Sequence, residues 1–243
     1  MAMPVLQLDP QQLRTCFDRR PFAARHRLAA DPGTDAPLVL AEAMRDAACS
    51  AGDEAGGDAP PRELSEACLD ELRRALAPLD AEVHGCTVRL TRMPAGAISE
   101  YRFEPEHQLL LQLHGHCTAH VFDPRDRRVL SEEELERCYT SGVRRLAYRV
   151  AVERHAEVFS LRAGDLLHVP VTAPHWLQNG ETPSLALRIG FRTASLRRRD
   201  AVYALNSRLR RLGIAPTPYG YAPLRDRLKA AAERALRRVL KPG

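Results

Sequence analysis

The spacing of hydrophobic residues predicts helices towards both ends of the chain. Near the start, Asp9-Pro10 is a helix-start signal, and the helix that follows would carry Leu13 and Phe17 on one face. Apolar residues recur at helical spacing, which predicts further helices over residues 38–48, 63–76, 200–212 and 224–240. The segment 50–61 is rich in Gly, Asp and Pro, so we predict a loop there.

Between residues 82 and 193 the pattern changes to short apolar runs separated by Gly, Pro and Asp turns. The runs predict strands over residues 83–93, 108–113, 118–122, 157–161, 166–171 and 184–191. One helix interrupts them over residues 131–139, where Ser131 and Glu134 have the spacing of a capping box. Many short strands joined by tight turns are typical of an antiparallel sandwich or barrel.

This pattern divides the chain into three parts. We expect an N-terminal helical and loop segment over 1–81, a barrel over 82–193 and a basic helical segment over 194–243. The last predicted helix lines up an apolar stripe opposite its arginines, so we expect that stripe to cover the barrel or a second subunit. A homodimer through the C-terminal helices is therefore one expectation. The stripe consists of Leu224, Leu228, Ala231, Ala235 and Val239.

The composition is that of an ordinary globular protein. Of the 243 residues, 44% are hydrophobic and 28% are charged, which excludes a disordered or fibrous chain. No apolar run approaches the ~18 residues that a membrane span needs, and the first residues do not follow the pattern of a secretory signal. We therefore expect a cytoplasmic protein without a membrane partner. The six cysteines include no CxxC pair, which argues against a zinc ribbon or a disulfide framework.

Charge is distributed unevenly along the chain. Residues 188–243 hold 15 Lys or Arg against 3 Asp or Glu, whereas the preceding residues are net acidic. Such a basic region can contact nucleic acid or an acidic partner. No aromatic residues alternate with these arginines and no known nucleic-acid motif accompanies them. The sequence therefore favours packing against the chain's own acidic part, or a solvated basic face. We therefore do not expect nucleic acid as a partner.

Two segments carry the most specific pattern: YRFEPEHQLLLQLHGHCTAHVFDP at 101–124 and GDLLHVPVTAPHWLQNG at 164–180. Here the chain resembles the bacterial JmjC-type, cupin-like proteins of the iron(II)/2-oxoglutarate oxygenase superfamily. The resemblance also includes RRPFAARHRLAADP, FDPRDRRVLSEEELERCY and NSRLRRLGIAPTPYG, in that order. It implies a mainly β fold with flanking helices, a double-stranded β-helix of the cupin type. It also implies iron(II) and 2-oxoglutarate as cofactors.

The superfamily holds iron with a His and a carboxylate two residues apart on one strand and a second His on a later strand. By resemblance, the carboxylate is Glu104 and the later His is His175, but the first His position holds Arg102. A guanidinium has no lone pair to give a metal. Because Arg102 and Glu104 share a strand face, we expect an ion pair between them where iron would lie. Loss of Arg102 would then leave Glu104 buried without a partner.

A second departure concerns the cosubstrate. The family commonly has a Lys that pairs with the 2-oxoglutarate carboxylate, and the matching position here is Cys117, which cannot make a charge-assisted contact. Metal ligands, if any, would be Glu104 and His175. The ligand pocket is expected to include Arg102, Glu104, Gln112, Cys117 and His175.

Three functions fit this sequence, and whether the protein is an enzyme stays open. In the first, the barrel keeps its fold, has lost the standard oxygenase reaction and binds an anionic small molecule or peptide. In the second, an oxygenase with a non-standard metal site, built on Glu104 and His175 with Cys117 or His116, acts on a peptide or small metabolite. In the third, the basic C-terminal helices give a regulatory or nucleic-acid-associated role.

Overall fold

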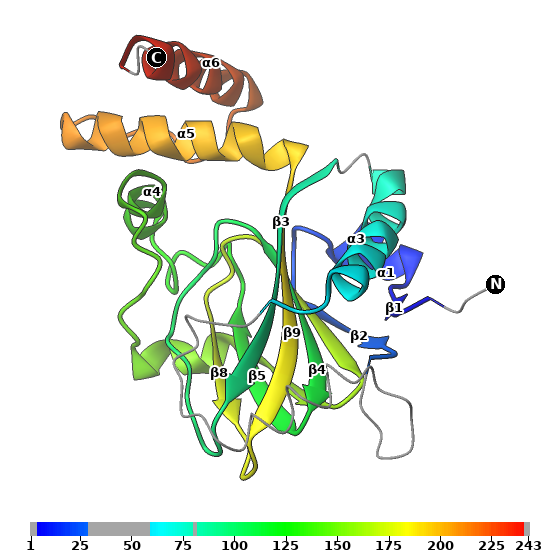
Figure 1. The fold of residues 1–243 in the computed structure, drawn as a ribbon. Helices are drawn as coiled ribbons and strands as arrows, with labels where there is room; N and C mark the ends of the chain where they lie inside the picture. The colour runs from blue at the N-terminus through cyan, green and yellow to red at the C-terminus, as the bar shows by residue number, and fades with distance from the viewer. Residues whose placement is uncertain (1–3, 29–58, 80–81, 241–243) are drawn as a thin grey trace.

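Two antiparallel sheets form the centre of the computed structural model, which describes residues 4–28, 59–79 and 82–240 (Figure 1). The larger sheet has the order β1 (Leu6–Gln7), β2 (Phe22–His26), β7 (Asp165–Val169), β4 (His107–His114), β9 (Ser184–Thr193) and β3 (Val83–Met93). The smaller sheet has the order β6 (Ala156–Arg162), β5 (His116–Phe122) and β8 (His175–Asn179). A buried apolar cluster with members from both sheets, including Leu110, Leu161 and Leu177, lies between them.

The strand order identifies the fold. An irregular segment before β4 bridges to β8 at Ile98 and Arg102 and so extends the smaller sheet. If this segment is counted as the second strand after β3, one sheet reads 1-8-3-6 and the other 2-7-4-5. This alternation of successive strands between two sheets is the double-stranded β-helix. The predicted fold class, a mainly β jelly roll with flanking helices, is confirmed.

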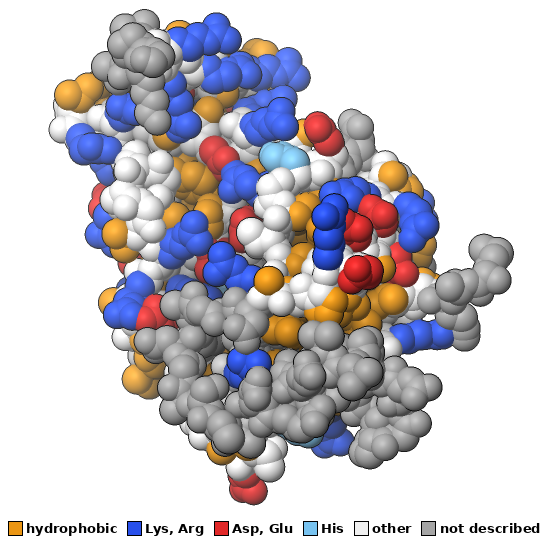
Figure 2. Space-filling model, in the orientation of Figure 1, with side chains coloured by type: hydrophobic (Ala, Val, Ile, Leu, Met, Phe, Trp, Pro, Cys, Tyr) orange, Lys and Arg blue, Asp and Glu red, His pale blue; other side chains and the backbone are white. Residues whose placement is uncertain are grey.

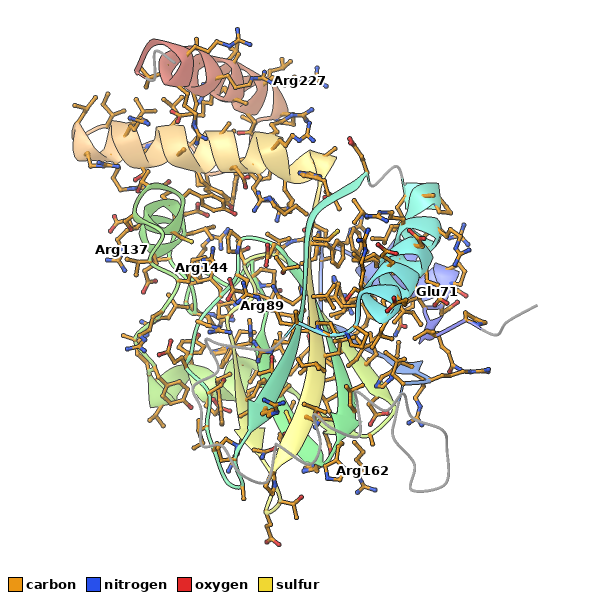
Figure 3. All side chains as sticks on the ribbon, viewed as in Figure 1. Glu71, Arg89, Arg137, Arg144, Arg162 and Arg227 are labelled. Carbon is orange, nitrogen blue, oxygen red and sulfur yellow. The ribbon has the colours of Figure 1, made fainter. Side chains whose placement is uncertain are left out.

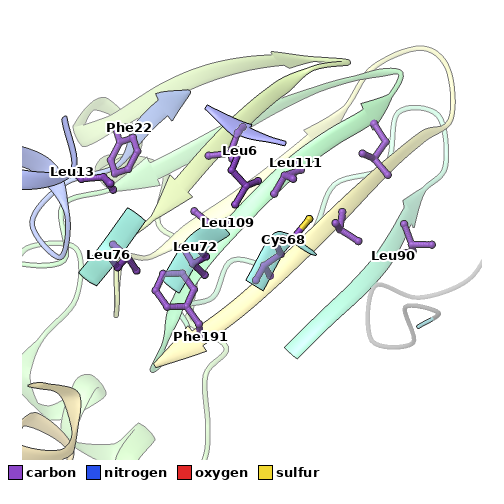
Figure 4. Packing of buried hydrophobic residues seen from close by; sticks show 14 of the residues in the cluster. Leu6, Leu13, Phe22, Cys68, Leu72, Leu76, Leu90, Leu109, Leu111 and Phe191 are labelled. Carbon is purple, nitrogen blue, oxygen red and sulfur yellow. The ribbon is translucent and has the colours of Figure 1, made fainter. Parts of the chain in front are cut away.

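The outer face of the larger sheet is covered by the N-terminal helices. Helix α1 (Pro10–Cys16) is capped by Asp9, whose carboxylate accepts from two backbone N–H groups. Helix α3 (Arg62–Leu76) turns Cys68, Leu72 and Leu76 towards the sheet, where they pack near Phe191 (Figure 4). This buried stripe is the one that the leucine spacing predicted. A short 3-10 turn, η1 (Ala77–Leu79), follows α3.

Three further helices stack beyond one end of the barrel (Figure 1). Helix α4 (Glu132–Ser141) follows the loop after β5 and begins with the predicted capping box. The Ser131 side chain accepts a hydrogen bond from the Glu134 N–H, and the Glu134 side chain accepts one from the Ser131 N–H. Helix α5 (Ala194–Arg211) continues directly from β9, and α6 (Pro223–Leu240) packs on α5. A second 3-10 segment, η2 (Val150–His155), precedes β6. In the described residues, no helix is both long and apolar enough to cross a membrane.

The structure corrects the sequence prediction at several elements. The six predicted strands are present, but β1, β2 and β8 were not predicted, because each is short and lacks clear alternation. Helix α5 starts earlier than predicted because it continues from β9 without a loop. The predicted helix over 38–48 and most of the predicted loop over 50–61 lie outside the described residues.

The last helix does not turn its apolar stripe to the barrel, so the alternative that the stripe covers a second subunit stays a prediction. Leu224 and Leu228 are 73% and 70% exposed, and the residues that α6 buries are Asp226, Ala230 and Glu233. The reason is that α6 packs on α5 with satisfied charges: Glu233 accepts hydrogen bonds from Arg208 on α5. The apolar stripe therefore does not cover the barrel.

Candidate functional site

The backbone joins two of the predicted site residues. Arg102 N–H donates to the His175 carbonyl at 3.1 Å, and His175 N–H donates to the Arg102 carbonyl at 2.8 Å. These bonds place the residue at the first His position beside the residue at the later His position, as the double-stranded β-helix requires of its second and seventh strands.

The side chain of Glu104 lies between two guanidinium groups. Arg102 Nε is 3.4 Å from Glu104 Oε1, which is the ion pair that the strand alternation predicted. Arg144 Nη1 donates to Glu104 Oε2 at 2.7 Å. The Glu104 side chain is only 11% exposed, so both of its carboxylate oxygens contact an arginine where little solvent reaches them. Arg144 was not predicted, because it comes from the loop after α4 and only tertiary packing brings it here.

These three residues line a cavity of about 350 Å³ in the mouth of the barrel. Arg89 on β3 and Arg188 on β9 also line it, and they are directly opposite each other in the antiparallel register. Figure 3 shows Arg89 and Arg144 near each other in the half of the barrel that lies closer to α5. The remaining lining residues are Thr87, Thr91, Glu106, Gln108 and Gly190.

The cavity holds a second carboxylate. Glu106 accepts a hydrogen bond from Gln108 Nε2 at 2.9 Å, and its pKa is raised by burial and by the neighbouring Glu104 charge. Gly190 keeps room for it: a Cβ at this position would overlap Glu106 Oε1 and lie 2.6 Å from Thr87 Oγ1. The absence of a side chain at residue 190 therefore makes room for the Glu106 carboxylate.

His175 is buried behind this cavity and is not among its lining residues. Its Nδ1–H donates to the Ala173 carbonyl at 3.0 Å. Burial, together with the charges of Arg188 and Arg102, lowers the pKa of His175 to about 4, although the hydrogen bond to the Ala173 carbonyl opposes this shift. The ring is therefore neutral at neutral pH.

The other two predicted pocket residues lie elsewhere in the barrel. Cys117 is 2% exposed and packs in the apolar cluster between the sheets. Gln112 is 1% exposed, and its Nε2 donates to the His114 carbonyl at 2.8 Å beside the turn. The structure thus brings together Arg102, Glu104 and the backbone of His175, but neither Gln112 nor Cys117 lines this cavity.

The residues present do not fit the iron centre that the resemblance implies. Among the described residues, no group of three His, Cys, Asp or Glu side chains is placed to hold a metal ion. A metal at Glu104 would have to displace both Arg102 and Arg144 from its oxygens. A guanidinium cannot replace an imidazole as a ligand because it stays protonated.

Comparisons with solved structures return proteins of similar fold. The chain is similar to YcfD from E. coli, with 13% identity over 96% of this chain and 68% of that one, at a TM-score of 0.48. A Pseudomonas putida prolyl-4-hydroxylase shares 17% identity over 75% of this chain and 96% of its own, at 0.46. Bacillus subtilis oxalate decarboxylase shares 21% identity over 53% of this chain and 28% of its own, at 0.30.

No family model and no curated protein matches the chain. The structural likenesses are distant, so they say nothing about a reaction or a ligand. The assignment of the fold rests on the strand order of the two sheets, and the function has to be argued from the cavity itself.

Four residues that sequence reasoning missed line this cavity: Arg89, Glu106, Arg144 and Arg188. The sequence did contain a signal for Arg89, because Thr87, Arg89 and Thr91 are two residues apart and so share one face of a predicted strand. Three polar residues on one face of a barrel strand indicate a polar interior. Arg144 and Glu106 lie in loops, where no periodicity reveals the direction of a side chain.

Proposed function

We propose that the barrel binds an anionic small molecule, or the acidic end of a peptide, through the arginines of the cavity and without iron-dependent oxygenase chemistry. The observation that carries this proposal is Arg89, which lines the cavity and has no ion-pair partner among the residues that the structure describes. Arg188 lies directly opposite it on the neighbouring strand, so two arginines come together at this part of the cavity wall. A negatively charged ligand would supply the counter-charge that Arg89 lacks.

The charge balance of the cavity supports the same ligand class. Four guanidinium groups and two carboxylates line it, and Glu104 already has two of the arginines as partners. Arg89 has no ion-pair partner among the residues that the structure describes. Planar guanidinium groups suit carboxylate and phosphate oxygens, which they contact with two parallel hydrogen bonds. The volume, at the small end of the usual range for ligand pockets, fits a metabolite or a single side chain.

Calorimetric titration of the metal-free protein tests the proposal with phosphate, citrate and 2-oxoglutarate as probes. We expect at least one to bind, and Arg89→Gln to weaken it by about tenfold, the loss of one charge-assisted contact. Arg74→Gln is the matched control, because Arg74 is exposed on α3 and does not line the cavity.

A second variant distinguishes the effect of the cavity's charge from the effect of its shape. Gly190→Val leaves the charge of the cavity unchanged but forces the Glu106 carboxylate and the Thr87 hydroxyl to move, and we expect it to weaken binding of the same probe. Equal affinity in wild type, Arg89→Gln and Gly190→Val would contradict the proposal. Stoichiometric iron or zinc in protein purified without chelator would instead favour the alternative, an oxygenase with a non-standard metal site.

A further inference from the structure

A second cavity lies where the barrel meets the C-terminal helices. Its volume is about 440 Å³, and none of its lining residues belongs to the arginine cavity described above. The loops after α1, β5 and β7 form one side, and α5 with the connector to α6 forms the other. We term this cavity the Arg/Tyr cleft; its lining includes Asp18, Arg125, Arg199, Tyr203, Tyr219 and Tyr221.

Arg199 is the fixed cation of this cleft. Its side chain is 15% exposed, and Nη2 donates to Asp18 Oδ2 at 2.5 Å. The guanidinium carbon lies 5.7 Å from the centre of the Tyr219 ring, within range of a cation–π contact. Within residues 4–28, 59–79 and 82–240, the buried Nε has no hydrogen-bond partner. Arg199 is therefore held in place while part of its hydrogen-bonding capacity remains unused.

Aromatic rings line the cleft beside this cation. Tyr203 is 4% exposed, and its ring centre is 5.8 Å from that of Tyr219. Tyr221 is 79% exposed. One deep ring, one intermediate ring and one exposed ring thus provide apolar faces along the cleft.

The backbone of the cleft is also unusual. Asp18 and Thr172 have φ values of 57° and 62°, and they are the two non-glycine residues with positive φ in the described ranges. This conformation is a real outlier for the β-branched Thr172. Its N–H donates to the Glu104 carbonyl at 2.8 Å, and its hydroxyl donates to the Val171 carbonyl at 2.6 Å. Strained residues held in this way cluster at ligand sites.

We propose that the Arg/Tyr cleft binds a nucleotide unit, with the base against the tyrosines and the phosphate against Arg125 and Arg199. Aromatic faces next to arginine are how proteins hold unpaired bases and their phosphates. Arg125 has no ion-pair partner in the described residues, whereas Arg127 is paired with Glu132. Arg125 is therefore the cation most available to a phosphate.

The surroundings favour a nucleotide over other aromatic anions. Lys and Arg side chains gather over the part of the molecule formed by α5 and α6 (Figure 2), where residues 188–243 hold 15 basic against 3 acidic residues. A polyanion that leaves the cleft would continue over this surface. In the sequence, no aromatic residues alternate with these arginines. The fold supplies them, because the connector before α6 brings Tyr219 and Tyr221 to the start of α5.

Two probes separate the possible sources of the nucleotide: AMP, and a fluorescently labelled single-stranded RNA of about ten nucleotides, which falls within usual site sizes. Affinities come from calorimetry and fluorescence anisotropy on the full chain. If the site takes a free nucleotide, AMP binds as tightly as the RNA. If the site binds one nucleotide within an RNA strand, the RNA binds at least about tenfold more tightly than AMP. Neutralising the exposed Arg197 and Arg198 then reduces the affinity for RNA to that for AMP.

The variants test the placement. We expect Arg125→Gln and Tyr221→Ser to weaken both probes by about tenfold, as the loss of a phosphate contact or a stacking face should. Both side chains are exposed, so the variants should fold. Arg74→Gln should leave both affinities within about twofold, because Arg74 is exposed on α3 and lines neither cavity.

Three results would overturn the inference. The first is no binding of AMP or RNA by the wild-type protein at millimolar concentration. The second is binding that neither Arg125→Gln nor Tyr221→Ser weakens. The third is capture of a phosphotyrosine peptide at this cleft when neither nucleotide probe binds, which would assign it to an acidic aromatic peptide.

Discussion

Replacing both arginines that contact Glu104 should destabilise the protein by more than the sum of the single changes. The Glu104 side chain is 11% exposed and lies between Arg102, 21% exposed, and Arg144, 49% exposed. A buried carboxylate that loses its partners costs about 3–5 kcal/mol. Either single Gln variant leaves one partner, and part of each contact is screened by water, so we expect about 1 kcal/mol for each.

The double variant Arg102→Gln/Arg144→Gln should therefore lose about 3 kcal/mol, at least about 1 kcal/mol beyond additivity. Urea unfolding of the four proteins of the cycle measures this coupling. Adding Glu104→Gln to the double variant should restore most of the loss, because no buried charge then remains. Additive effects within about 0.5 kcal/mol, or no restoration by Glu104→Gln, would refute the reasoning.

The sequence alone led to a different expectation, in which Arg102 was the single partner of Glu104. The structure corrects this, because Arg144 Nη1 reaches Oε2 of the same carboxylate at 2.7 Å. Loss of Arg102 by itself should consequently cost less than the loss of a sole partner.

Three further predictions concern pH, metal and packing. Burial lowers the pKa of His107 and His168 well below 6.5. Only the imidazoles of the unfolded chain then take up protons at about pH 6. The free energy of unfolding should therefore be constant above about pH 7 and fall by about 1.4 kcal/mol per pH unit for each histidine below about pH 6.5. Urea unfolding at a series of pH values measures this, and a free energy of unfolding that does not change with pH would contradict it. Arg102→His should raise iron(II) affinity in anaerobic titrations, and an unchanged affinity would count against the placement of the first metal position. Leu72→Ala, in the core under α3, should cost about 2–5 kcal/mol by urea unfolding, against less than about 0.5 kcal/mol for the exposed Leu224→Ala.

The sequence by itself determined the local features of this protein. The leucine spacing of residues 63–76 predicts the helix that buries Leu72, and the capping box of Ser131 marks the start of α4. The Arg102–Glu104 ion pair follows from two residues that share one face of a strand. Each of these inferences depends on residues a few positions apart, whose relative placement is decided by backbone geometry alone.

Only the tertiary structure decided which distant residues meet. Arg144 reaches Glu104 from 40 residues away, and Arg89 faces Arg188 because of the register between β3 and β9. The exposed leucine stripe of α6 shows the same limit, since helical spacing marks an apolar face but does not say which face packs on a neighbour. Strand register and helix docking depend on how the whole core packs, so no local pattern of side chains can specify them.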